Sequence, residues 1–240
     1  MKEKNEAVDR QTESSAPLNE AEKVIHRRRN VRAYQKKRVP KDMVRRVIEA
    51  GQFAPSSGNT QPWKFVVIQD PDLIAEMTAD HTKACQNMMK LLDFLAPGKT
   101  RRAWLTKLLQ FIDPSLFHAN AQTLLKVIAD NRLRLWHGTK TVIIIFINKR
   151  APGYPELDAG IAGQNMVLTA HSLGLRTCWV TFAGLLFFSR FTGATKWKKR
   201  FNIKHPYKMI SSICFGYPRG EVNGIANRKK STVDWYTGGG

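Results

Sequence analysis

The sequence predicts one domain that contains both helices and strands and is preceded by a short N-terminal arm. Two apolar runs have the length of strands, residues 64–69 and 141–148, and segments with helical periodicity stand between and around them. A chain of 240 residues is long enough to bury a full hydrophobic core in one domain. The hydrophobic content of 42% is typical of a soluble globular protein.

The composition argues against several classes of protein. No apolar run reaches the roughly 18 to 20 residues that span a bilayer, and the first ten residues are charged, so no secretory signal is expected. The three cysteines, Cys85, Cys178 and Cys214, stand far apart. This spacing argues against an iron–sulfur or zinc site and against a disulfide framework, and it predicts a cytoplasmic protein. The six histidines show no metal-ligand spacing, so no metal site is expected.

The formal net charge of +20 predicts attraction to anions, which include phosphate-bearing cofactors, nucleic acid and anionic membranes. The sequence has no zinc-finger spacing, no basic region joined to heptads and no aromatic strand typical of RNA-binding domains. We therefore expect no nucleic-acid partner.

Residues 1–20 are polar and lack periodicity, which predicts a flexible N-terminal arm. A helix is expected from Asn19, and it leads into a run of cations at residues 27–32. This run is either a solvated basic helix end or a set of guanidinium groups that converge on one anion. A second helix is predicted over residues 42–53, with Pro40 near its start.

Residues 54–63 form a corner between that helix and the first strand, with the sequence Ala-Pro-Ser-Ser-Gly-Asn-Thr-Gln-Pro-Trp. Turn residues of this kind leave backbone N–H groups free and tolerate unusual backbone angles, and the strand that follows holds them in place. The corner is therefore a candidate site for a planar polar ligand. The alternative is an ordinary connecting loop.

Residues 72–137 are predicted to be helical, with breaks at 96–100 and 113–114. Within them, residues 101–117 are both basic and apolar, which indicates an amphipathic helix on the core or, alternatively, a lid or a membrane-touching segment. The run at 141–148 is apolar without interruption, so we expect a central strand that is covered on both faces.

A turn at 153–156 precedes a helix expected over 157–173, which ends at Gly174. Four small residues in this helix would let another helix approach closely: Ala159, Gly160, Ala162 and Gly163. Two more strands are predicted at 176–182 and 208–215, and residues 182–201 mix aromatic and basic side chains.

Four separated segments, in this order and spacing, resemble the nitroreductase family of FMN-dependent oxidoreductases. They are residues 28–32, 55–63, 163–179 and 216–229. The resemblance covers nearly all of the chain from Val24 to Trp235, apart from a helical insertion or lid at about 80–137. It implies an α+β fold in which helices surround a central mixed sheet. It also implies a single FMN-binding domain at 21–240 and an intertwined homodimer with FMN at the subunit interface.

The resemblance also assigns residues to the cofactor. The phosphate would be held by Arg28, Arg29 and Asn30, and from the C-terminal side by Arg228 and Lys229. Arg32 would reach the N1/O2 edge of the flavin ring, and Thr181 and Phe182 would run past its N5 side. The corner would line the flavin with Pro55, Ser56, Ser57 and Asn59, while Gln61 supports it. The family generally needs no protein nucleophile or acid–base residue, so no catalytic residue is assigned.

Simple chemistry agrees with this assignment. A cation near N1 favours electron uptake by a flavin, and a buried phosphate needs several charge-assisted partners. No GxGxxG motif follows a strand, so NAD(P)H is expected as a transient co-substrate. It would deliver hydride to N5 and leave before a nitroaromatic, a quinone or a similar acceptor binds, in a ping-pong reaction. The positive charge favours NADPH over NADH.

Two alternatives stay open on the sequence. The protein could act mainly as a basic membrane-surface or partner-binding module, through residues 101–117 and 187–200. It could also be a flavin enzyme of different chemistry, either dehalogenation or flavin fragmentation.

The chain departs from the family pattern at two positions. Asn30 stands where the family usually has Ser, and Arg176 stands where it usually has a small Gly. Cys178 follows within the same pattern on a predicted buried strand, so a packing role is expected for it rather than redox chemistry.

Overall fold

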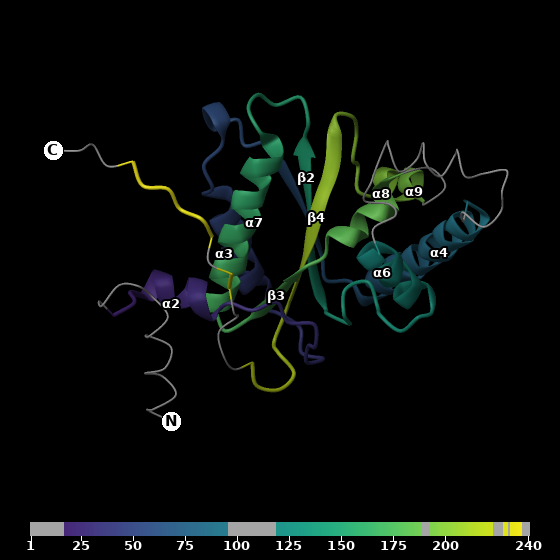
Figure 1. Cartoon of the computed structure of the whole chain (residues 1–240), viewed down its shortest axis with the longest axis horizontal. Helices are drawn as coiled ribbons and strands as arrows, with labels where there is room; N and C mark the ends of the chain where they lie inside the picture. Colours follow the sequence, from purple (N-terminus) through teal and green to yellow (C-terminus); the bar gives the residue numbers. More distant parts are fainter. Residues whose placement is uncertain (1–16, 96–118, 189–192, 223–227, 230, 237–240) are drawn as a thin grey trace.

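The computed structural model describes residues 17–95, 119–188, 193–222, 228–229 and 231–236 (Figure 1). Its centre is a four-stranded sheet in the order β1-β2-β4-β3. The strands are β1 (Trp63–Ile68), β2 (Thr141–Asn148), β3 (Arg176–Trp179) and β4 (Tyr207–Gly216). All three strand pairs are antiparallel, so the sheet that these strands form is not mixed, whereas the resemblance implies a mixed sheet. In the described segments the one parallel pairing is an isolated bridge between Asn30 and Thr177.

Strand β2 lies in the middle of the sheet and is covered on both faces, as its unbroken apolar sequence predicts. Alternate side chains point to opposite faces of a strand, so β2 contributes to two separate core clusters. Ile143 and Ile145 belong to the cluster that contains Val47 of α3. Ile144 and Phe146 belong to the other cluster.

Two groups of helices pack on the two faces of the sheet, which gives the α+β architecture (Figure 1). On one side lie α3 (Lys41–Gln52) and α7 (Pro155–Ser172). On the other side, α4 (Pro71–Leu95), α8 (Leu185–Phe188) and α9 (Ala194–Arg200) place Met77, Leu186 and Trp197 in the core. Helix α6 (Ala119–Ala129) packs against α4. No helix in the described segments has both the length and the apolar character that crossing a bilayer requires.

Helices α3 and α7 approach each other closely, as predicted, but Gly51 of α3 permits the contact, and the predicted Gly160 and Gly163 of α7 do not face α3. A Cβ built on Gly51 of α3 would lie 3.3 Å from the carbonyl oxygen of Ala162 and would collide with Met166. Ala159 and Ala162 are buried, whereas Gly160 faces open space. Gly51 therefore makes this helix contact possible.

The N-terminal helix α2 (Glu20–Arg27) begins where the sequence predicts a helix start. The side chain of Asn19 accepts a hydrogen bond from the backbone N–H of Glu22 at 2.9 Å. In return, the carboxylate of Glu22 accepts one from the backbone N–H of Asn19 at 2.7 Å. This reciprocal capping box satisfies two N–H groups that a helix start otherwise leaves unpaired.

Two predicted elements are wrong in their extent. Residues 130–137 are not helical, because the backbone enters the left-handed region at Asn131 (φ 56°) and His137 (φ 52°) to turn the chain into β2. The predicted strand at 176–182 ends at Trp179, and a short 3-10 helix, η3 (Thr181–Gly184), follows it. The predicted helix breaks and the segment 101–117 lie outside the described residues.

Candidate functional site

The first part of the site is an extended segment, residues 30–35, held between β3 and the chain that follows β4. The backbone N–H of Val31 donates to the carbonyl of Thr177 at 2.9 Å. The N–H of Gln35 donates to the carbonyl of Tyr217, also at 2.9 Å. These bonds fix three cations relative to the sheet: Arg28 and Arg29 just before the segment, and Arg32 within it.

Three arginines come together at the start of this segment. Burial lowers the pKa of Arg28, and the neighbouring charge of Arg228 lowers it further. The pKa of Arg29 is also lowered, first by burial and then by the charges of Arg228 and Arg28. Asn30 accepts a hydrogen bond from Arg28 at 3.1 Å, so the residue that departs from the family pattern supports this cluster. In the described segments, no carboxylate pairs with Arg28 or Arg29.

Among the described residues, the arginine cluster therefore concentrates positive charge without a negative partner. The buried Nη2 atom of Arg29 has no hydrogen-bond partner among the residues that the structure describes. A phosphate group at this place would supply both the missing charge and the missing acceptor. Lys229 is exposed, and no contact in the described segments joins it to the cluster.

A cavity of about 300 Å³ lies beside the extended segment. It brings Arg32 together with Thr181 and Phe182, which the sequence assigns to one ligand. The rest of its wall is mostly apolar and comes from α6, the turn after it and β3: Leu124, Ile128, Leu133, Leu135, His137, Cys178, Trp179 and Val180. One cation on a largely apolar wall suits a planar ring that carries negative charge at one edge.

The short helix η3 is tied to its surroundings at successive residues. The N–H of Val180 donates to the carbonyl of Ser212 at 2.7 Å, and the Thr181 hydroxyl lies 3.3 Å from that of Ser211. The carbonyl of Phe182 lies 3.1 Å from Nε2 of His81.

Two histidines that the sequence analysis left without a role therefore belong to this region. His81 touches Phe182, and His137 lines the cavity, where burial and then the charge of Arg32 lower its pKa. Neither has a motif around it. The sequence does offer one indication of the position of His137. The next residue, Gly138, marks a turn that leads the chain back into the sheet.

The corner between α3 and β1 is held by its own side chains. The hydroxyl of Ser56 accepts from the N–H of Gln61 at 2.9 Å, and the side chain of Gln61 donates to that of Asn59 at 3.0 Å. Gln61 thus supports the corner, as expected. The N–H of Ser57 donates to the carboxylate of Asp158 in the first turn of α7, at 3.3 Å. Pro55, Ser57 and Asn59 are exposed.

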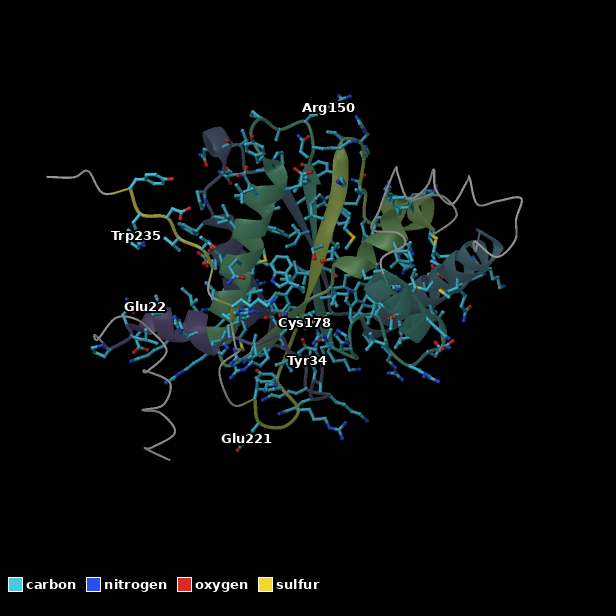
Figure 2. The ribbon with its side chains drawn as sticks, in the orientation of Figure 1. Glu22, Tyr34, Arg150, Cys178, Glu221 and Trp235 are labelled. Atoms are coloured by element: carbon cyan, nitrogen blue, oxygen red, sulfur yellow. The ribbon has the colours of Figure 1, made fainter. Side chains whose placement is uncertain are left out.

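One copy of the chain does not bring the corner and the arginine cluster together. The corner contacts Asp158 near the start of α7, whereas His171 in its last turn lies in the charge field of Arg28. Asp158 and His171 are thirteen positions apart along the helix, which is a rise of about 20 Å. Figure 1 shows the α3–β1 connection and α2 at opposite ends of α7. Figure 2 shows the same separation. Arg150, in the loop before the start of α7, lies far from Tyr34, which belongs to the extended segment beside the arginine cluster.

The second departure from the family pattern, Arg176, is accommodated at the start of β3. Its Nη1 donates to the carbonyl of Leu175 at 2.9 Å, and burial lowers its pKa. Cys178, two residues on, is buried in the core, and burial raises the pKa of its thiol. This agrees with the packing role expected for it. The described segments contain no group of three His, Cys, Asp or Glu residues that could hold a metal ion.

Several known proteins resemble the chain. A putative NADH dehydrogenase/NAD(P)H nitroreductase from Methanothermobacter thermautotrophicus is 24% identical over 194 residues, which cover 81% of this chain and 75% of that protein. Shorter matches cover 37% of a relative with the same name from Archaeoglobus fulgidus, at 32% identity, and 17% of iodotyrosine deiodinase 1 from Sus scrofa, at 44% identity over 50 residues. The chain thus spans well under two thirds of these last two proteins.

A solved structure shares the fold of the chain, and a family model matches most of its sequence. The crystal structure of a nitroreductase with bound FMN from Bacteroides fragilis superposes with a TM-score of 0.69, at 20% identity, over 92% of this chain and all of that one. This likeness shows that the two share a fold. The model of the nitroreductase family matches residues 25–217. The chain therefore belongs to the nitroreductase family.

Proposed function

We propose that the protein binds FMN and acts as an NAD(P)H-dependent oxidoreductase on small electron-poor acceptors such as nitroaromatics and quinones. The observation that carries this proposal is the cluster of Arg28, Arg29 and Arg228, which has no carboxylate partner in the described segments. The Bacteroides fragilis relative in fold carries FMN, which has a phosphate group.

The residues present fit this cofactor. A phosphate dianion needs several charge-assisted donors, and the three arginines offer them. One of these donors is the buried Nη2 of Arg29, which has no partner within the described ranges. The cavity beside Arg32 has the mostly apolar wall that a flavin ring requires. The two features lie at the two ends of one short stretch of chain, residues 28–32, so phosphate and ring can belong to the same molecule.

Each part of the chain then has a defined task. Arg28, Arg29 and Arg228, with Asn30, would hold the phosphate, and Lys229, the next residue after Arg228 in the sequence, would add a further positive charge. Arg32, Thr181 and Phe182 line the cavity that would hold the ring. A positive charge from Arg32 near the N1/O2 edge would favour reduction, and Thr181 and Phe182 would lie toward N5. When bound, FMN supplies two-electron chemistry between NAD(P)H and the acceptor, which use the same site in turn.

The site also implies a homodimer. Because the corner and the arginine cluster lie at opposite ends of α7, they can contact one FMN only if the corner comes from a second copy of the chain. That copy would contribute Pro55, Ser56, Ser57 and Asn59. Their exposure in one copy agrees with this role, apart from Ser56, which is half-buried.

The charge and the cysteines extend the proposal. The net charge of +20 favours NADPH, whose extra phosphate adds negative charge, over NADH. All three cysteines are free and buried, which suits a reducing cytoplasm.

Reductive dehalogenation of an aromatic substrate is a second candidate, because of the 44% identity with iodotyrosine deiodinase 1 over 50 residues. A role on membranes has less support, because Phe188 is the one exposed large apolar side chain in the described part of residues 187–200. Phe187 and Trp197 are buried, and Lys196 and Arg200 pair with carboxylates of α4.

The visible absorbance of the purified full-length protein tests the proposal. We expect flavin bands that bleach when NADPH is added without oxygen and that return with a nitroaromatic or a quinone. A colourless protein that also refuses added FMN would overturn the proposal. Bands that return only with a halogenated phenol would replace the first candidate with the second.

A further inference from the structure

Helix α4 carries a fully buried histidine, His81, whose two ring nitrogens both have neighbours. Nε2 lies 3.1 Å from the carbonyl oxygen of Phe182, and Nδ1 lies 3.7 Å from Sγ of Cys85, one turn further along the helix. Phe182 belongs to the cavity wall. His81 therefore contacts that wall, although it is 101 positions away from Phe182 in the sequence.

The chemistry of the three groups fixes the tautomer of the imidazole. A carbonyl oxygen only accepts, so Nε2 must carry the proton and donate it to Phe182. Nδ1 is then the acceptor for the thiol of Cys85. Burial lowers the pKa of His81 to about 4 and raises that of Cys85 to about 12, so both groups are neutral near pH 7. Every polar atom of the pair is thus satisfied.

Helix α4 also holds the side chain of Phe182. The rings of His81 and Phe182 meet edge to face, with centroids 5.5 Å apart and an interplanar angle of 78°. Phe182 further packs against the cluster formed by Cys85, Leu125 and Ile128. Both the ring and the carbonyl of Phe182 are therefore fixed by α4 and α6.

The helix that carries His81 is itself anchored. Lys196 of α9 pairs with Glu76 and with Asp80, each at 2.7 Å, and Arg200 pairs with Glu76 at 2.7 Å. Asp80 is the residue next to His81. A shift of His81 along or about the helix axis would therefore disturb this network.

We propose that His81 is a positioning residue for the reaction. Its Nε2–H donates to the carbonyl of Phe182. This hydrogen bond fixes the turn at Thr181 and Phe182, which lines the cavity proposed for the flavin ring. The proposal rests on the proposed function, because it assigns that cavity to the flavin ring. The backbone N–H of Leu185, at the end of the same short helix, also donates to this carbonyl. Without His81 the carbonyl would therefore lose its hydrogen bond to α4, and the turn could shift away from the cavity.

Two substitutions separate hydrogen bonding from packing. His81→Phe keeps an aromatic ring but has no donor, whereas His81→Gln can place an amide N–H near the position of Nε2. Met77→Leu is the matched control, because Met77 is fully buried in the same helix. It belongs to the core cluster that contains Ile144 and Phe146, whereas Phe182 packs against a different cluster. All three are measured as full-length protein loaded with FMN.

For His81→Phe, we expect the rate of flavin reduction at saturating NADPH to fall about tenfold or more, since a small misplacement of a reacting group has an effect of this size. The FMN dissociation constant should change less than about threefold, because the phosphate site is untouched. His81→Gln should restore most of the rate, and Met77→Leu should leave it unchanged.

Amide hydrogen exchange supplies a readout that does not need flavin. Exchange at residues 181–184 should speed up in His81→Phe and remain slow in the other two variants, with or without FMN. Equal rates and equal exchange in all proteins would overturn the role of His81. If wild type binds no flavin but exchange still changes as expected, the proposed function fails while the anchoring of the turn by His81 stands.

Discussion

Gly163 of α7 faces the indole of Trp179 at the end of β3, and no side chain fits between them. A Cβ built on Gly163 would collide with the Trp179 ring and would lie 3.1 Å from Cδ1 of Ile145. Trp179 also lines the cavity. The absence of a side chain at position 163 therefore allows the central helix to lie directly against the strand that leads into the site.

Gly163→Ala should destabilise the protein by about 1–3 kcal/mol, the usual cost of overpacking a rigid core. Gly160→Ala is the matched control, because Gly160 lies on the same helix and a Cβ there has no neighbour within 4 Å. Helix propensity predicts that this control gains about 0.5–1 kcal/mol. Urea unfolding of both variants measures the difference, and equal effects at the two positions would contradict the packing described.

Arg28→Ala should weaken FMN binding by about 1.5–3 kcal/mol, or roughly 10- to 150-fold, as one charge-assisted hydrogen bond is lost. The apoprotein should be no less stable, because Arg28 is part of a cluster of like charges. Fluorescence titration with FMN and thermal unfolding without FMN measure the two effects.

Arg45→Ala is the control for a change of charge alone, since Arg45 pairs with Asp42 on the exposed side of α3. It should leave FMN affinity nearly unchanged. Full retention of FMN by Arg28→Ala during purification would place the phosphate elsewhere.

The parts of the fold that the sequence predicts well are those with a local cause. The alternation of apolar and polar residues, the cap at Asn19 and the unbroken apolar run of β2 act within a few residues, so each can be read from its own segment. The arginine cluster is predicted for a related reason. Arg28 and Arg29 are neighbours in sequence, and only Arg228 joins them from afar.

The parts that were missed depend on distant residues. The turn after α6 requires left-handed backbone at Asn131 and His137, which helical periodicity does not reveal. His81 has no motif around it, and its partner Phe182 is 101 positions away. The separation of the corner from the arginine cluster follows from the course of α7, so the sequence could assign both to one ligand without showing that one copy keeps them apart.

The proposed sharing of each site between two copies predicts complementation between two defective variants. Arg28→Ala damages the phosphate side of a site, and Asn59→Trp places a bulky ring on the exposed corner. In a heterodimer, one site collects both defects and the other is intact. Random mixing of the two chains should therefore restore roughly a quarter of full flavin binding, whereas each variant alone binds little.

Absorbance at the flavin bands after co-expression measures this recovery, and sedimentation equilibrium should show two chains per particle. Mixing two samples of the same variant is the control and should restore nothing. A monomer that binds FMN fully, or a mixture without recovery, would contradict the shared site.

The buried imidazole of His81 predicts that acid destabilises the protein. Its pKa is near 4 in the fold and 6.5 in a free histidine, so the unfolded chain binds the additional proton between these values. The free energy of unfolding should therefore fall as the pH drops from about 6.5 to 4, by about 3 kcal/mol from this group. Wild type and His81→Gln, unfolded in urea across this range, test the assignment. The variant should lose the share of the pH dependence that His81 contributes while it keeps the fold at pH 7. The shares of His171 and His137, whose pKa values are also lowered, should remain. An unchanged slope would mean that His81 does not contribute to the acid sensitivity.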